Sequence, residues 1–226
     1  RPRLYGSYRG GTLSFGALDP LIFTGSKEPF KLPDMRLRVS DGRALLESDY
    51  GPVGISLSGN GPLRGGFAGE LAASAPRLAL GHCEMRGTTL YGKLTVTSER
   101  PGFEGPLRLA ALACPDQALS VESAALQVTA RADQALTRFD GEAGLRAGAA
   151  RMGTNRLAAL GGEGEFTWRA EGLTARYDLD GTDLVTGAAR AAGVGIDGSL
   201  RTRRDFARIE VDARLSGQGV GPGEAA

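Results

Sequence analysis

The chain has very little of the material from which catalytic and metal sites are built. Its 226 residues include two Cys, one Trp and a single His. His82 stands next to Cys83, so in a strand the two side chains would point to opposite faces and could not form a nucleophile–base pair. One histidine also excludes a multi-histidine zinc site. We therefore expect no enzymatic activity, no metal and no cofactor, with His82 at the surface or hydrogen-bonded within the fold.

An excess of charge and long apolar runs are missing too. Lys and Arg number 27 against 26 Asp and Glu, so no net field favours nucleic acid as a partner. No apolar run approaches the roughly 18 residues of a membrane-spanning helix. Aromatics are only 6% and Gly reaches 35, a composition that favours a thin, extended sheet over a thick core. The chain begins at Arg1 without a signal peptide, and we interpret it as a segment of a longer protein.

A Phe-x-Gly motif recurs in the middle of the chain, at Phe67 to Gly69, Phe103 to Gly105 and Phe139 to Gly141. Both steps are 36 residues (103 − 67 and 139 − 103). Such a period is typical of stacked arrays of one supersecondary unit. We therefore predict one continuous β segment over residues 1–226, with repeat-like units near 64–100, 101–136 and 137–172 and a flexible tail over 217–226.

Apolar residues alternate along most of the chain, as at Phe103, Gly105, Leu107 and Leu109. Alternation places them on one face of a strand. Strands at intervals of roughly 8 to 12 residues, joined by short links, favour antiparallel neighbours. The predicted fold is all-β: an extended, curved antiparallel sheet of repeated strands with few or no helices.

Local irregularities leave some alternatives open. Leu119 and Val121 keep one parity while Leu126 and Val128 keep the other, which a bulge near 124–125 would explain. A helix over 133–139 competes with the strand interpretation, and residues 188–192 could form one helical turn. Residues 21–23 are predicted to form a short buried strand.

Three polar patterns resemble sites for calcium or phosphate but have simpler explanations. The carboxylates from Asp178 to Asp183 and the segment Gly193 to Asp197 resemble calcium loops, yet both lack the full ligand set and are better explained as turns. The closely spaced Arg201, Arg203 and Arg204 could bind phosphate, although a solvated strand face explains them more simply.

Several stretches together resemble a known family: Leu4 to Arg9, Leu18-Asp19, Gly42 to Val53, Gly105 to Leu112 and Cys114 to Asp116. They are similar to the YdbH-like branch of the AsmA-like, TamB-related proteins of Gram-negative bacteria. The resemblance implies an inner-membrane anchor and a folded-over, taco-like periplasmic β-sheet whose apolar groove carries phospholipid to the outer membrane. This chain would be an internal segment. Its partners would be phospholipid or another acyl-chain lipid, neighbouring segments of the longer chain, and the membranes through regions outside this segment.

The alternating runs supply the residues expected to line such a groove. They are Leu107, Leu109, Leu126, Val128, Phe166, Trp168, Leu173, Tyr177, Leu179, Ile209 and Val211. The alternative is a structural spacer or adhesin-like rod without ligand, in which these side chains only pack against one another.

The two cysteines are preceded by the same tripeptide. Arg77-Leu78-Ala79 reaches Cys83 with the spacing at which Arg108-Leu109-Ala110 reaches Cys114. The match predicts equivalent positions in successive units, and a periplasmic setting would oxidise the pair to a disulfide. Two buried free thiols are the alternative.

Overall fold

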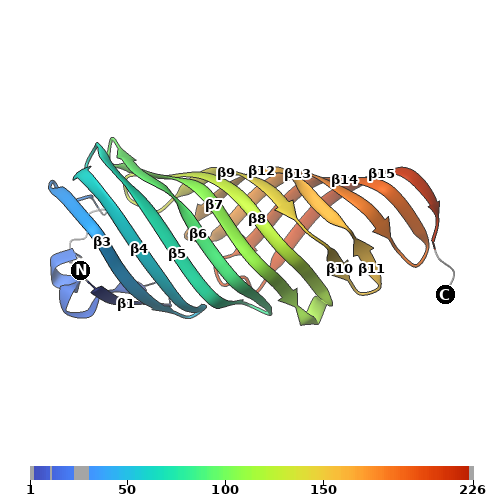
Figure 1. The fold of residues 1–226 in the computed structure, drawn as a ribbon, viewed down its shortest axis with the longest axis horizontal. Helices are drawn as coiled ribbons and strands as arrows, with labels where there is room; N and C mark the ends of the chain where they lie inside the picture. The colour runs from blue at the N-terminus through green and yellow to red at the C-terminus, as the bar shows by residue number, and fades with distance from the viewer. Residues whose placement is uncertain (1–2, 11, 23–30, 224–226) are drawn as a thin grey trace.

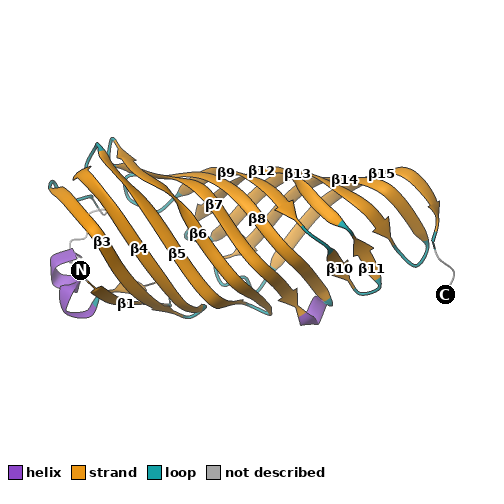
Figure 2. Ribbon diagram, in the orientation of Figure 1, coloured by secondary structure: helices purple, strands orange, loops and turns teal. Residues whose placement is uncertain are grey.

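A single β-sheet dominates the computed structural model, which describes residues 3–10, 12–22 and 31–223 (Figures 1 and 2). The strands are β1 (Arg3–Arg9), β2 (Thr12–Ser14), β3 (Arg36–Ser48), β4 (Gly51–Pro62), β5 (Phe67–Leu80), β6 (Cys83–Thr97), β7 (Arg100–Cys114), β8 (Leu119–Ala132), β9 (Phe139–Ala147), β10 (Ala150–Met152), β11 (Asn155–Leu157), β12 (Ala159–Arg169), β13 (Gly172–Val185), β14 (Ala189–Arg203) and β15 (Ile209–Pro222). The all-β prediction is confirmed.

Helical structure is confined to single turns, η1 (Gly16–Leu18), α1 (Asp19–Ile22) and η2 (Pro115–Gln117). Within the described ranges, no helix is long and apolar enough to cross a membrane. The strand predicted at 21–23 is wrong for its first two residues, which belong to α1, and its third lies outside the described residues.

The strands follow one another in space almost as they do in sequence. From β3 to β9 each strand pairs antiparallel with the next, and β9, β12, β13, β14 and β15 continue the sheet. The short β10–β11 hairpin pairs with β8 and β13. One pairing departs from the prediction, because β1 runs parallel to β3. The sheet is therefore mixed, though mostly antiparallel.

The sheet folds over on itself, so that the orange and red strands pass behind the green ones in Figure 1. Side-chain contacts support this arrangement. The turn between β14 and β15 carries Arg204, which bonds Tyr8 in β1 and, through its carbonyl oxygen, the hydroxyl of Tyr50 in the β3–β4 turn. Sequence separations of 196 and 154 residues show that opposite ends of the sheet meet there.

The 36-residue period corresponds to one β-hairpin, because Phe67, Phe103 and Phe139 lie near the starts of β5, β7 and β9. The ring of Phe67 lies over Gly59 of the preceding strand, where an added Cβ would come within 2.6 Å of the ring. Phe103 covers Gly92 in the same way, at 2.8 Å. Glycine thus leaves room for the ring from the neighbouring strand.

The change of parity in β8 has a local cause at Ser123. This residue has φ of 51°. The pairing between β7 and β8 skips Ser123, but it also skips one residue of β7, so both strands have the same number of residues across the irregularity. No residue is inserted, so the irregularity is a left-handed residue rather than the predicted bulge. Gly87 of β6, with φ of 60°, interrupts its strand similarly.

A disulfide joins Cys83 and Cys114. Cys83 opens β6 and Cys114 closes β7, so the antiparallel pairing of these strands brings them opposite each other. The matched tripeptides are not equivalent, because Arg77 lies in β5 and Arg108 in β7 itself. Beside the disulfide, Nδ1 of the exposed His82 lies 2.9 Å from the Asp116 carboxylate.

Three further segments differ from the sequence-based expectations. Residues 217–222, expected to be a flexible tail, belong to β15 and pair with β14. Their backbone groups complete a ladder, which glycine supports even without side chains to pack. Residues 189–192 are strand rather than a helical turn. Residues 133–138 form a loop held by the Asp133 carboxylate, which accepts the backbone N–H groups of Thr137 and Arg138.

Candidate functional site

One row of apolar residues crosses twelve strands in unbroken register. Each member is the direct cross-strand partner of the next, and only one position is glycine: Leu4, Ala44, Ile55, Ala73, Leu90, Leu107, Leu126, Leu145, Gly162, Leu179, Ile196 and Leu215. Direct partners project from the same side of a sheet. We call this side the apolar face.

All of the predicted lining residues lie on the apolar face. Leu107, Leu126 and Leu179 belong to the row itself. The other eight lie two, four or six residues along their strands from a member of the row, and therefore on the same face: Leu109, Val128, Phe166, Trp168, Leu173, Tyr177, Ile209 and Val211. The structure thus brings the eleven residues together on one surface.

The apolar face is the inner face of the folded sheet, and it is only partly covered. Phe67 and Val96 on this face are 3% and 5% exposed. Nine of the eleven predicted residues are half-buried, whereas Ile209 and Val211, on the edge strand, are 51% and 59% exposed. Among the described residues, no large side chain is completely buried.

The total surface shows how extended the sheet is. The accessible surface is 14468 Å² for a mass of 23.5 kDa, whereas a compact monomer of this mass exposes about 9,800 Å². The excess is that of a thin, extended sheet, which has much more surface than a compact domain of the same mass. Much of the apolar face is within reach of solvent or a ligand.

Sequence reasoning missed several members of the row, notably Ile55, Leu145 and Ile196. The neighbours of Leu145 on its own face are alanines, at 143 and 147. Apolar and polar residues do alternate there, but the small alanines make the apolar side of the pattern weak. Ile55 stands in an alternating run that the sequence shows but that was not connected to the later strands. Register across strands, which the sequence does not encode locally, connects them.

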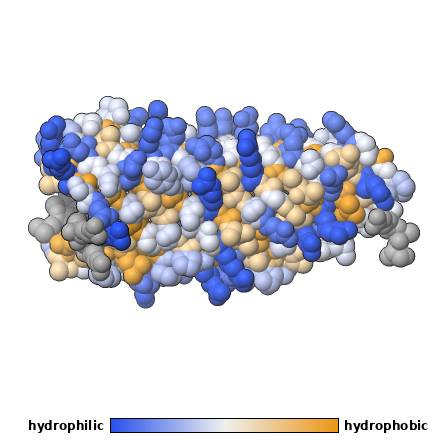
Figure 3. Space-filling model, in the orientation of Figure 1, coloured by the Kyte–Doolittle hydropathy of each residue, from blue (hydrophilic) through white to orange (hydrophobic). Residues whose placement is uncertain are grey.

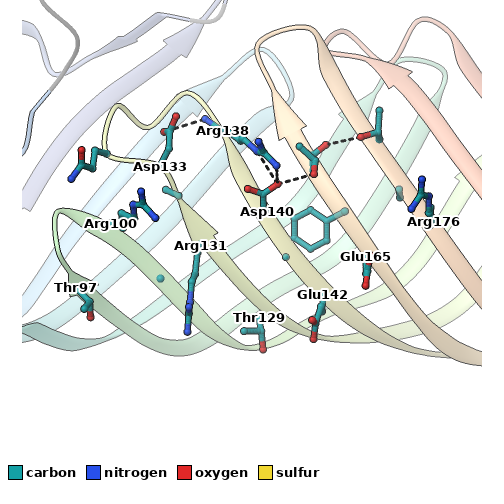
Figure 4. A pocket seen from close by; sticks show the side chains of 18 of the residues that line it. Thr97, Arg100, Thr129, Arg131, Asp133, Arg138, Asp140, Glu142, Glu165 and Arg176 are labelled. Carbon is teal, nitrogen blue, oxygen red and sulfur yellow. Dashed lines mark hydrogen bonds and ion pairs between the residues drawn. The ribbon is translucent and has the colours of Figure 1, made fainter.

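The opposite face carries most of the charged side chains of the strands, and Figure 3 shows hydrophilic side chains along the upper edge and in separate clusters, with apolar surface between them. A hollow of about 1460 Å³ lies on it, lined largely by Thr, Arg, Asp and Glu side chains. Figure 4 shows Thr129, Glu142 and Glu165 side by side on adjacent strands. Asp140 accepts hydrogen bonds from Arg138 (2.9 Å) and from Thr167 (2.8 Å). These bonds, chiefly that from Arg138, lower the pKa of the Asp140 carboxyl.

The β14–β15 turn ties the two ends of the folded sheet together. Arg204 donates a hydrogen bond to the Tyr8 hydroxyl, and its guanidinium carbon lies 5.8 Å from the centre of the Tyr8 ring. This hydrogen bond raises the pKa of Arg204. Phe206 adopts φ of 54°, a conformation that bulky residues rarely take, and its ring lies 5.8 Å from that of Trp168 on the apolar face. We call this turn, residues 204–208, the latch.

The carboxylate patterns do not form a metal site. Residues 178–183 and 193–197 lie inside β13 and β14 rather than in turns, as the sequence had suggested. Strand geometry keeps successive carboxylates on opposite faces or spreads them along one face. In the described part of the chain, no three His, Cys, Asp or Glu side chains are grouped to hold a metal ion.

Comparison with known protein families gives a match over almost the whole chain. A family model described as "YdbH-like: Intermembrane phospholipid transport protein YdbH" covers residues 1–223. Searches of curated proteins and of solved structures found no match. The match spans nearly the whole chain, so the chain belongs to the YdbH-like family of intermembrane phospholipid transport proteins.

Proposed function

We propose that the apolar face of this chain holds the acyl chains of phospholipid as a section of a periplasmic groove between the inner and outer membranes. The observation that carries the proposal is the twelve-strand row, which offers an acyl chain an uninterrupted apolar path. At about 4.8 Å per strand, eleven steps amount to roughly 53 Å along the sheet, longer than one extended acyl chain.

The energetics favour an occupied face. Burying one Leu or Val side chain against hydrocarbon instead of water stabilises by about 1.5 to 3 kcal/mol. Large exposed apolar surfaces on soluble domains generally mark interaction sites. A lipid has the extended shape and chemistry that match a long apolar row.

A carrier role also agrees with the chemistry of the chain. No set of nucleophile, base and acid emerges from its residues, so we propose a lipid carrier rather than an enzyme. Neighbouring segments of a longer chain would continue the sheet, and regions outside this segment would contact the membranes. The competing function is a spacer in which the two layers pack without ligand.

Native mass spectrometry of the chain purified without detergent from Gram-negative cells tests the proposal. We expect adducts with the masses of phospholipids, which disappear after organic extraction. A chain that is folded and lipid-free at every stage would support the spacer instead.

A further inference from the structure

A second, smaller hollow, of about 610 Å³, lies where β12–β15 reach the latch. It adjoins the larger polar hollow, with which it shares Thr167, Thr174 and Arg201. Four arginines line it, Arg169, Arg201, Arg203 and Arg208, against two glutamates, Glu171 and Glu210. The hollow therefore carries an excess of positive side chains.

The strand pairing places two of the arginines on either side of Gly172. Arg169 and Arg203 are both direct partners of Gly172, one on each side of it, so their backbones are about 10 Å apart and their side chains share a face. Gly172 leaves the floor between them open. It has φ of 145°, and an added Cβ would come within 1.9 Å of the Thr202 carbonyl oxygen.

Acidic side chains within the protein offset only part of this positive charge. Arg208 pairs with a glutamate at 3.0 Å, but Arg203 reaches an aspartate only at 4.0 Å. Arg169 interacts electrostatically with the Asp140 carboxyl, and Arg201 is the direct cross-strand partner of Glu210. Within the described ranges, neither arginine forms an ion pair as short as the one between Arg208 and its glutamate. Guanidinium groups match phosphate oxygens in charge and in planar, bidentate geometry.

The hollow lies at the ends of strands that also carry the apolar face. Leu173 and Thr202 are among the residues that line it, although their side chains project from the apolar face, where they are direct cross-strand partners. Trp168 is the partner of Leu173 on the next strand. Apolar side chains and arginines thus meet at one edge of the sheet. This combination suits an amphipathic molecule with a phosphate at one end.

We propose that this hollow binds the phosphate group of a phospholipid whose acyl chains lie on the apolar face. The lipid part of this inference rests on the proposed function, whereas phosphate binding rests on the arginines alone. A free phosphate ester would use the same guanidinium groups, so the two sources are tested separately.

The first test titrates glycerol 3-phosphate into the ¹⁵N-labelled chain at low salt and follows the arginine Nε–H resonances by NMR. We expect saturable shifts at Arg169 and Arg203, and affinity about tenfold weaker for each of the two replaced by Ala, the effect of losing one charge-assisted hydrogen bond. Arg146→Ala is the control, because Arg146 is exposed on the same polar face and lies outside both hollows. Absence of saturable binding, or an equal loss with Arg146→Ala, would overturn the proposal.

The second test measures the phospholipid retained by the purified double variant Arg169→Ala, Arg203→Ala, with its fold checked by circular dichroism. We expect a fall of about tenfold or more relative to Arg146→Ala, while uptake of phosphate-free diacylglycerol stays unchanged. Unchanged phospholipid with weakened glycerol 3-phosphate binding would assign the hollow to free phosphate esters and overturn the headgroup assignment. If the unsubstituted chain carries no lipid, the proposed function fails, and the titration still decides phosphate binding.

Discussion

Replacing Leu126 by Glu places a charge in the middle of the apolar row. Leu126 is half-buried and pairs directly with Leu107 and Leu145. Losing one leucine contact with hydrocarbon costs about 1.5 to 3 kcal/mol, which corresponds to roughly 10- to 150-fold in occupancy. Since the side chain is only half-buried, we expect a loss near tenfold.

Gln127→Glu is the matched control, since it puts the same side chain one position along β8 on the exposed, polar face. Lipid retained after purification is measured by native mass spectrometry for both variants, with thermal unfolding as the check on folding. Leu126→Glu should lose lipid and stay folded, and Gln127→Glu should keep both. If Leu126→Glu unfolds the chain and the unsubstituted protein is lipid-free, Leu126 belongs to a dry core and the reasoning is wrong.

Three other predictions concern stability. Thiol counting under denaturing, non-reducing conditions should find no free thiol, and two reactive thiols would contradict the pairing of Cys83 with Cys114. The two cysteines are 31 residues apart, so reducing the disulfide should lower the free energy of unfolding by about 3 to 4 kcal/mol. Tyr8→Phe removes the hydroxyl that accepts the hydrogen bond from Arg204. Because such a bond contributes about 0.5 to 1.5 kcal/mol, amide hydrogen exchange in β1 and the latch should become several-fold faster. Unchanged exchange would show that the latch does not hold the ends of the sheet together. The lowered pKa of Asp140 means that its stabilising contribution is complete above the ordinary carboxyl pKa and is lost as pH falls through the lower folded value; an NMR titration midpoint at or above the ordinary value would contradict this.

Much of the apolar face could be predicted from sequence, because alternation alone decides which side of a strand a residue takes. The runs around Leu107, Val128 and Tyr177 are of this kind, and their residues share one face in the structure. Local period carries no information on which strands become neighbours, so the row across twelve strands emerges only from the register.

Features that depend on distant contacts could not be read from the chain. The latch joins Arg204 to Tyr8 across 196 residues, and the parallel pairing of β1 with β3 depends on a crossover. The glycine-rich end of β15 lacks the side chains that indicate a strand, yet its backbone completes the ladder with β14. The cysteine pairing follows from antiparallel neighbours rather than from the repeat that suggested it.

Photo-crosslinking at consecutive positions of β9 tests the central claim most directly. A photoreactive residue is placed in turn at 143, 144, 145 and 146, where Ala143 and Leu145 face the apolar side and Gly144 and Arg146 the polar side. The proposed function predicts phospholipid adducts at 143 and 145 and none at 144 and 146, in step with the two-residue period of the strand. Adducts at none of the four positions, or equally at all of them, would contradict it.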